Sequence, residues 1–333
     1  MLLPCFAAAE PLRIATWHVE LSRDGPGRLL GDLMEPDDQV RAVVDVIASA
    51  RPDVILLTDV DWDSGGEAAL ALQHLLDTAG TPLPHAFAPP PNAGVQRGLD
   101  VDGDGRTGEP EDALGYGRFR GDGGLLLLAN RPLEPLRDLS ALPWAEAPGS
   151  LMTEDERAAL EPLPLGTIGH WSVTLDDGPE LLLLMAGPPV FDGPEDRNGR
   201  RNADEVALWP HYLDGTLGPR ADLPFVLLGN ANLDPEDGDG RRDAIRALLS
   251  DPRLQDPQPR GDAPPDPAQA GDPGLDTADW PEPRPGNLRV SYVLPSADWI
   301  VTDAGVIWPT PGTPAATASR HGLVWVDLTR PGS

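Results

Sequence analysis

Several short apolar runs in this chain stop abruptly at polar residues, and this repeated pattern limits the folds that are available. The clearest case is residues 224–240, PFVLLGNANLDPEDGDG. Residues 225–228 show no alternation of polar and apolar side chains, which predicts a strand covered on both faces. Gly229 then permits a tight turn, and Asn230 and Asn232 share one side of the extended backbone because they are two residues apart. The pattern indicates a buried strand with amide side chains at its tip.

The same arrangement recurs along the chain, so several strand ends are expected to contribute polar groups. The other apolar runs and their polar neighbours are 12–17 with His18 and Glu20, 53–58 with Asp59 and Asp61, 181–185 with Asp192, 289–294, and 322–326 preceded by His321. Strand ends gathered at one edge of a sheet are a common way for α/β enzymes to assemble a site from distant positions. A strand is also predicted at 123–130 and a hairpin at 170–185.

Helical periodicity predicts helices on the outside of these strands. Apolar residues fall on one face of 39–50, where Asp37 and Asp38 can cap the first turn. Further helices are predicted at 67–79, 154–160 and 241–249, and one ends near residue 212. Residues 132–164 are otherwise expected to be loop. The order at the start of the chain is therefore β-α-β.

The composition of the chain limits the classes of ligand that it is expected to bind. The 333 residues carry a net charge of −29, and every basic residue is Arg. So negative a field repels a nucleic-acid backbone, which favours a small phosphoester over duplex nucleic acid. No apolar run is long enough to cross a bilayer. Residues 10–330 are expected to form one domain, with a Pro- and Asp-rich excursion at 256–286.

The N-terminal segment has features of an export signal. Residues 1–9 place apolar residues before small ones, as in the end of a secretory signal cut after Ala9. This interpretation predicts an exported protein, and the alternative is an apolar N-terminus of a cytoplasmic one. The single Cys5 excludes an internal disulfide framework and a zinc site built from cysteines.

An acidic loop matches the spacing of a calcium-binding loop. Asp100, Asp102, Asp104 and Glu111 fit the pattern D-x-D-x-D-G-x5-E, with Gly105 at the sharp turn. Oxygen ligands at alternate positions and a distal glutamate can surround Ca²⁺. The alternative is a solvated acidic turn without an ion.

The densest polar segment lies at 188–205, ahead of a predicted helix. Arg197, Asn198 and Arg201 could meet a phosphate together with backbone N–H groups at the helix start. The alternative is a network of arginine and carboxylate pairs that satisfies itself.

Taken together, these strand ends resemble the endonuclease/exonuclease/phosphatase superfamily, whose fold is that of deoxyribonuclease I. The matching segments, in order, are RIATWH, RPDVILLTDVD, PFVLLGNANLDP, RVSYVLPSAD and SRHGLVWVDL, so the resemblance extends from about residue 12 to residue 328. The fold that it implies is a four-layer α/β sandwich, in which two mixed β-sheets pack face to face and helices cover them.

The resemblance also implies a site for phosphoester hydrolysis. A divalent ion, Mg²⁺ or Mn²⁺, would be held at the positions of His18 and Asp59. Asn230 and Asn232 occupy the positions that orient water and phosphate. His321 occupies that of a histidine that stabilises the transition state, and the neighbouring Arg320 could hold the phosphoryl group.

The chain departs from the family pattern at several of these positions. The family has Asn at 18, Glu at 59, His at 185, Asp at 230, Asp at 291 and Asp at 320, where this chain has His18, Asp59, Met185, Asn230, Ser291 and Arg320. Three hypotheses follow. The protein is a metal-dependent phosphoesterase with a modified site, or a pseudoenzyme that binds a phosphorylated ligand or partner, or a calcium-stabilised extracellular binding protein.

Overall fold

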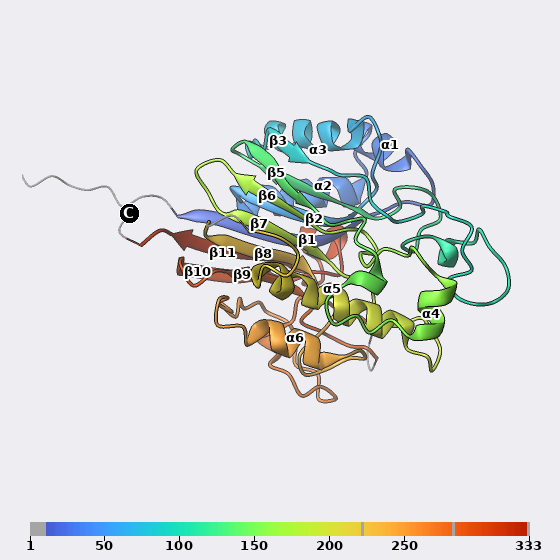
Figure 1. Cartoon of the computed structure of the whole chain (residues 1–333). Coiled ribbons are helices and arrows are strands. Elements are labelled where there is room, and N and C mark those ends of the chain that lie inside the picture. The colour runs from blue at the N-terminus through green and yellow to red at the C-terminus, as the bar shows by residue number, and fades with distance from the viewer. Residues whose placement is uncertain (1–10, 221–222, 282–283, 332–333) are drawn as a thin grey trace, which may run out of the picture.

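Two β-sheets pack face to face and helices cover both outer faces (Figure 1). The computed structural model describes residues 11–220, 223–281 and 284–331. The six-stranded sheet has the order β10 (Ile300–Ile307), β11 (Leu323–Thr329), β1 (Leu12–Leu21), β2 (Val54–Val60), β4 (Gly124–Ala129), β3 (His85–Phe87). The five-stranded sheet has the order β5 (Leu133–Asp138), β6 (Trp171–Leu175), β7 (Glu180–Met185), β8 (Phe225–Asn230), β9 (Ser291–Pro295). Both sheets are mixed, since β1 is parallel to β2 and β7 is parallel to β8, whereas the other pairs are antiparallel.

Three apolar clusters separate these layers. The central one lies between the sheets and includes Ile14 and Leu56 from one sheet and Leu183 and Leu228 from the other. The outer face of the six-stranded sheet is covered by α1 (Arg28–Met34), α2 (Asp38–Ala50), α3 (Glu67–Thr78) and α7 (Pro314–Ala318). The outer face of the five-stranded sheet is covered by α5 (Arg197–Leu213) and α6 (Arg242–Leu249). The predicted four-layer sandwich is confirmed.

Local sequence signals account for several elements. The predicted cap of α2 is present, because a carboxylate oxygen of Asp37 accepts a hydrogen bond from the backbone N–H of Val40 at 2.8 Å. The predicted hairpin is β6 and β7, and the remaining predicted helices are α3, α4 (Glu154–Ala159) and α6. The expectation of loop at 133–138 is wrong. These residues form the edge strand β5, whose mostly exposed side chains and Pro135 conceal it, since an edge strand tolerates proline.

The excursion at 256–286 returns to the sheet edge, next to His321. In its described part the regular structure is one short 3₁₀ helix, Pro273–Leu275. Ala278 then forms isolated bridges with Leu288 and with His321. The excursion therefore supplies side chains to the same edge at which the predicted site residues lie.

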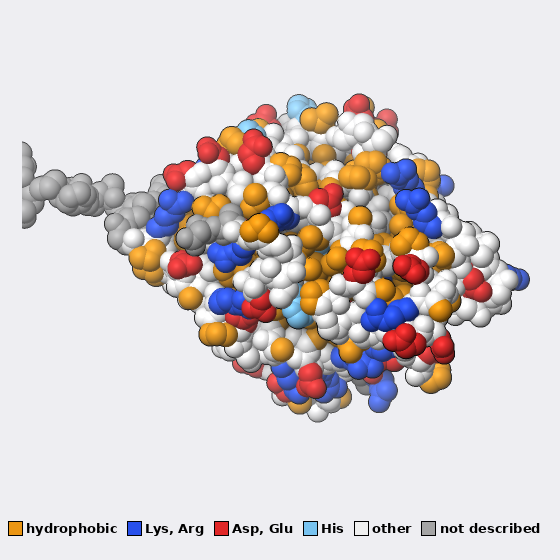
Figure 2. Space-filling view, viewed as in Figure 1, with side chains coloured by type: hydrophobic (Ala, Val, Ile, Leu, Met, Phe, Trp, Pro, Cys, Tyr) orange, Lys and Arg blue, Asp and Glu red, His pale blue; other side chains and the backbone are white. Residues whose placement is uncertain are grey.

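Charged side chains of both signs are interspersed on the face of the molecule shown in Figure 2. No helix in the described ranges is both long enough and apolar enough to span a membrane. The predicted export signal at 1–9 lies outside the described residues.

Candidate active site

The five residues predicted to form the centre of the site lie together. They are His18 on β1, Asp59 on β2, Asn230 at the end of β8, Asn232 just beyond it, and His321 just before β11. Nδ1 of His18 is 3.1 Å from Nδ2 of Asn230, and the rings of His18 and His321 are 4.3 Å apart. Nε2 of His18 is 3.9 Å from a carboxylate oxygen of Asp59. Residues more than 300 positions apart in the chain thus meet at one edge of the sandwich.

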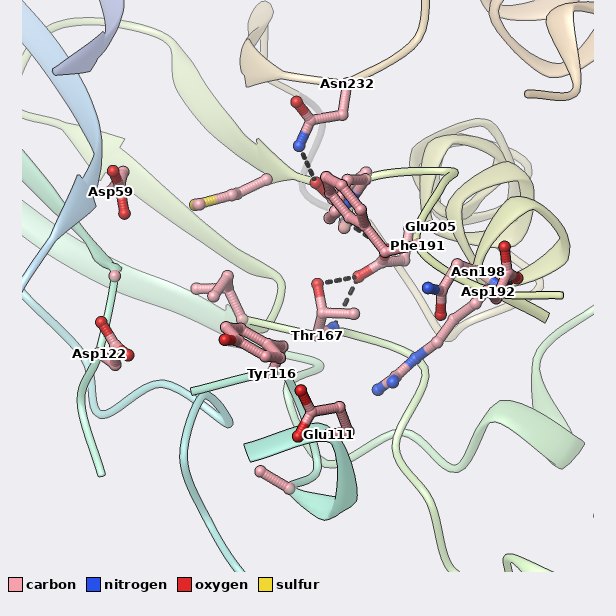
Figure 3. A pocket seen from close by; sticks show the side chains of 18 of the residues that line it. Asp59, Glu111, Tyr116, Asp122, Thr167, Phe191, Asp192, Asn198, Glu205 and Asn232 are labelled. Atoms are coloured by element: carbon pink, nitrogen blue, oxygen red, sulfur yellow. Dashed lines mark hydrogen bonds between the residues drawn. The ribbon is translucent and has the colours of Figure 1, made fainter. Parts of the chain in front are cut away.

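Four of these five residues border a pocket of about 1050 Å³. His18, Asp59, Asn232 and His321 line it, and Figure 3 shows Asp59 and Asn232 reaching its space from different segments of the chain. Asp59 and Asn232 both have left-handed backbone, with φ of 62° and 49°. Asp and Asn adopt this conformation more readily than most residues, which turns their side chains out of the regular strand direction.

Three positions at which the resemblance implies other side chains form a continuous row beside this pocket, and of the three Met185 lines it. In the pairing of β7, β8 and β9, Met185 lies opposite Asn230, and Asn230 lies opposite Ser291. All three side chains are buried. The hydroxyl of Ser291 has no hydrogen-bond partner among the described residues. The positions at which the resemblance implies other side chains therefore form one contiguous patch.

His321 is buried and neutral. Its ring packs edge-on against Trp280 of the excursion with centroids 5.0 Å apart, and its Nδ1 has no hydrogen-bond partner in the described structure. Burial, with smaller contributions from His18 and Arg320, holds the pKa of His321 well below its ordinary value. The ring can therefore donate one N–H to a ligand at neutral pH.

The residues predicted to bind phosphate differ in how many of their hydrogen-bond donors are already bonded within the protein. Arg320 lines the pocket, and its Nε and backbone N–H both donate to Glu20 at 2.8 Å. Arg197 also lines the pocket, and its Nε donates to Glu156 at 3.1 Å. Asn198 donates its side-chain N–H to the carbonyl of Val190 and its backbone N–H to Asp192. These three residues therefore lie at the pocket, and each also forms hydrogen bonds with other residues of the protein.

Arg201 is the most deeply buried of the arginines predicted to bind phosphate. It is 6 % exposed, its Nε donates to the carbonyl of Leu165, and its Nη2 donates to the carbonyls of Leu114 and Pro164. These buried donors are satisfied by the backbone of surrounding loops. Arg201 therefore holds the pocket wall together, and it also lines the pocket, so the predicted phosphate-binding role stays a prediction.

The acidic loop forms a cluster whose membership differs from the sequence pattern. Oxygens of Asp100, Asp102 and Asp112 lie within 4.8 Å of one another. Glu111, the predicted distal ligand, instead lines the pocket (Figure 3). The short 3₁₀ helix Pro110–Asp112 accounts for the difference, because it points neighbouring side chains in different directions. Asp104 accepts a hydrogen bond from Arg106 N–H and is exposed.

The calcium prediction for this loop can be checked by thermal unfolding. Ca²⁺ at millimolar concentration should raise Tm by several degrees through preferential binding to the folded state. Asp102→Ala should abolish the rise. Asp104→Ala serves as the matched control, since the clustered oxygens predict that it keeps most of the shift. Equal loss in both variants would favour the original sequence pattern, and no shift in the parent would favour the solvated acidic turn.

Several residues that line the pocket were not predicted from the sequence. Tyr116 and Phe191 line the wall with 62 % and 90 % of their surfaces exposed, although large aromatic side chains are usually covered. Trp280 comes from the excursion, where composition indicated only loop. Glu205 is fully buried, and burial raises its pKa to about 7. Its oxygens accept hydrogen bonds from Thr167 and from the N–H of Gly187, so it anchors α5 to two loops of the pocket.

A divalent ion at the predicted position finds a poor set of ligands. His18 and Asp59 offer two groups, but Nδ1 of His18 faces an N–H of Asn230, which places the ring proton on Nε2, the nitrogen nearer Asp59. In the described ranges, the only group of three His, Cys, Asp or Glu side chains with closely spaced ligand atoms is in the acidic loop. The residues present therefore do not fit the ion that the resemblance implies.

Comparisons with known proteins agree with this architecture. Among solved structures, similar folds are an endonuclease/exonuclease/phosphatase from Beutenbergia cavernae, at 20 % identity and TM-score 0.55, covering 97 % of this chain and 72 % of that one, and a family protein from Leptotrichia buccalis, at 13 % identity and TM-score 0.55, covering 96 % and 99 %. A third, from Bacteroides thetaiotaomicron, has 14 % identity and TM-score 0.50, covering 97 % and 99 %. A comparison with curated proteins finds no match.

The family assignment comes from the sequence itself. The model of the endonuclease/exonuclease/phosphatase family matches residues 27–321, which is most of the chain. This match includes all the predicted site residues except His18. The chain therefore belongs to the endonuclease/exonuclease/phosphatase family.

Proposed function

We propose that this protein binds a phosphorylated small molecule in the pocket and does not hydrolyse it by the metal-dependent route of its family. The observation that carries this proposal is the buried row Met185, Asn230 and Ser291. An amide cannot accept a proton as a carboxylate does, and a thioether donates no hydrogen bond. Since loss of one general acid or base costs on the order of 10²–10⁴ in rate, a patch with three such changes should leave little catalysis.

Hydrogen-bond donors at the pocket support binding of a phosphate. The guanidinium of Arg320, the neutral ring of His321 and the Nε2–H of His18 belong to residues lining the same space. The whole chain carries a net charge of −29, so one phosphate group is far easier to accommodate than a polyanion. Tyr116 and Phe191 offer exposed aromatic surface for the organic part of such a ligand.

Calorimetric titration with inorganic phosphate and with phenyl phosphate tests this proposal. We expect both to bind, and phenyl phosphate to bind more tightly because of the aromatic wall. Arg320→Gln should weaken binding by about 10-fold or more, since hydrogen bonds to charged groups contribute roughly 1.5–3 kcal/mol. Arg41→Gln on the exposed face of α2 is the matched control and should leave affinity unchanged. Absence of binding to either compound would refute the proposal.

A phosphoesterase with a modified site is the second candidate, because Asp59, Asn232 and His321 still meet in one pocket. Hydrolysis of bis(p-nitrophenyl) phosphate and p-nitrophenyl phosphate with Mg²⁺, Mn²⁺ or Ca²⁺ separates the two candidates. A phosphate-binding pseudoenzyme should show no turnover above background. Turnover that His321→Ala abolishes would establish the phosphoesterase instead.

A further inference from the structure

We infer that Asn230 holds His18 in the tautomer with its proton on Nε2, so that the family's metal position becomes a hydrogen-bond donor to an anion. The inference concerns two neighbouring positions. The resemblance implies a carboxylate where this chain has Asn230, and an amide where it has His18. Its last step, metal-independent binding of a phosphoester, rests on the proposed function. Its first steps rest on hydrogen bonds alone.

The orientation of the Asn230 amide follows from its neighbours. The carbonyl of Ala186 can only accept, so the side-chain nitrogen of Asn232 donates to it at 2.8 Å. The side-chain oxygen of Asn232 must then face Asn230, where it accepts from Nδ2 at 3.2 Å. The backbone N–H of Asn232 can only donate, and it donates to Oδ1 of Asn230 at 2.8 Å. Both ends of the network therefore give the same amide orientation.

This orientation decides the tautomer of His18. One hydrogen of Asn230 Nδ2 is directed to Asn232, and the other is left for Nδ1 of His18 at 3.1 Å. A proton on Nδ1 would oppose that N–H. The hydroxyl of Thr58, also 3.1 Å from Nδ1, can donate or accept and so imposes no choice. The neutral ring therefore carries its proton on Nε2, on the side of Asp59 and the pocket.

The tautomer has a chemical consequence for the pocket. A protonated ring nitrogen has no lone pair for a metal, whereas its N–H can bond a phosphoryl oxygen. A carboxylate at position 230 would reverse the arrangement, because it would accept from Nδ1–H and leave Nε2 free. Histidine ligands to metals usually have such a partner on the other nitrogen, and loss of the partner costs about 10–100-fold in metal affinity. The amide at 230 is thus the positioning group that excludes the metal.

Nitrogen NMR of the histidine rings tests the tautomer directly. Long-range ¹⁵N–¹H spectra of the six-histidine chain, with His18 assigned by its loss in His18→Gln, should show a protonated Nε2 and a bare Nδ1. In Asn230→Asp the pattern should reverse. A proton on Nδ1 of His18 in the parent protein would overturn the inference.

Calorimetric titration with Zn²⁺ and Mn²⁺ tests the exclusion of metal. Asn230→Asp should gain one site, or tighten it at least about 10-fold, and the additional change His18→Gln should remove it. Asn198→Asp adds the same charge to the same pocket and serves as the matched control, so it should gain nothing. Equal gain in Asn198→Asp would show a charge effect and refute the role of Asn230, as would no gain in a folded Asn230→Asp.

Phosphate titration in the presence of EDTA completes the test. Binding to the parent protein should be unchanged by EDTA, and His18→Gln should weaken it. Loss of binding in EDTA would overturn the metal-independent step. Absence of phosphate binding under any condition would contradict the proposed function, whereas the NMR and metal titrations would still decide the role of Asn230.

Discussion

Restoring four residues is expected to give this protein metal-dependent phosphodiesterase activity. The variant carries His18→Asn, Met185→His, Asn230→Asp and Ser291→Asp, which together replace the neutral patch with the side chains that the family resemblance implies. An oxygen ligand would then stand beside Asp59, a carboxylate would be available to orient water, and a second histidine would face the phosphoryl group. Hydrolysis of bis(p-nitrophenyl) phosphate with Mg²⁺ or Mn²⁺ should exceed the parent's rate by at least about 100-fold.

The changes have to be made together because the positions contact one another. Asn230 bonds to His18 and pairs in register with Met185 and Ser291, so the effects of single reversions are not expected to add up to that of the four changes. Adding His321→Ala to the four changes should abolish the new activity. A four-residue variant that unfolds as cooperatively as the parent, binds Mn²⁺ and still shows no turnover would mean that the scaffold has lost more than these side chains.

The central strands and the convergence of the site were predictable because their signals are local and strong. Unbroken apolar runs such as 225–228 are needed wherever a strand is buried on both faces, and the runs 12–17, 53–58 and 225–228 each end within two residues of a polar residue of the site. The order of five strand ends then matched one known topology. That topology places His18, Asp59, Asn230 and His321 together even though nothing in their sequence spacing does.

The remaining features depend on tertiary contacts that no local pattern records. β5 is an edge strand with an exposed proline, so its sequence has the composition of a loop. Arg201 and Arg197 are two arginines in one polar segment, yet Arg201 is buried and bonds the carbonyls of Leu114, Pro164 and Leu165, whereas Arg197 is not among the buried residues. Trp280 reaches His321 because the excursion returns to the sheet edge. In each case the partner lies far away in the chain.

Replacing Asp276 with Asn is expected to stabilise the fold at alkaline pH. Asp276 lies in the excursion and is 6 % exposed. Burial raises its pKa to about 7, and the negative charges of Asp234, Asp237 and other nearby aspartates add to the effect. In the unfolded chain this carboxyl would titrate near its ordinary pKa of about 3.9. The native state therefore holds a proton on Asp276 over a pH range in which the unfolded state has lost it.

The sign of the pH dependence follows from this difference. Asp276 contributes its full stability below about pH 4, and the contribution is lost as pH rises towards 7, where the native state must carry a buried charge among like charges. Asn lacks this penalty and keeps the size of the side chain, so the variant should be more stable than the parent by about 2 to 4 kcal/mol at pH 8 and by little at pH 4. Urea unfolding at both pH values measures the difference.

Asp279→Asn is the matched control for this prediction. It removes the same charge three residues away, from a side chain that is exposed. Its effect should be within about 0.5 kcal/mol at both pH values, because surface substitutions away from special features rarely do more. A gain in Asp276→Asn that is equally large at pH 4 and pH 8 would show that packing is responsible. A pH-dependent gain in stability confined to Asp276→Asn would show that ionisation of the Asp276 carboxyl destabilises the excursion next to His321.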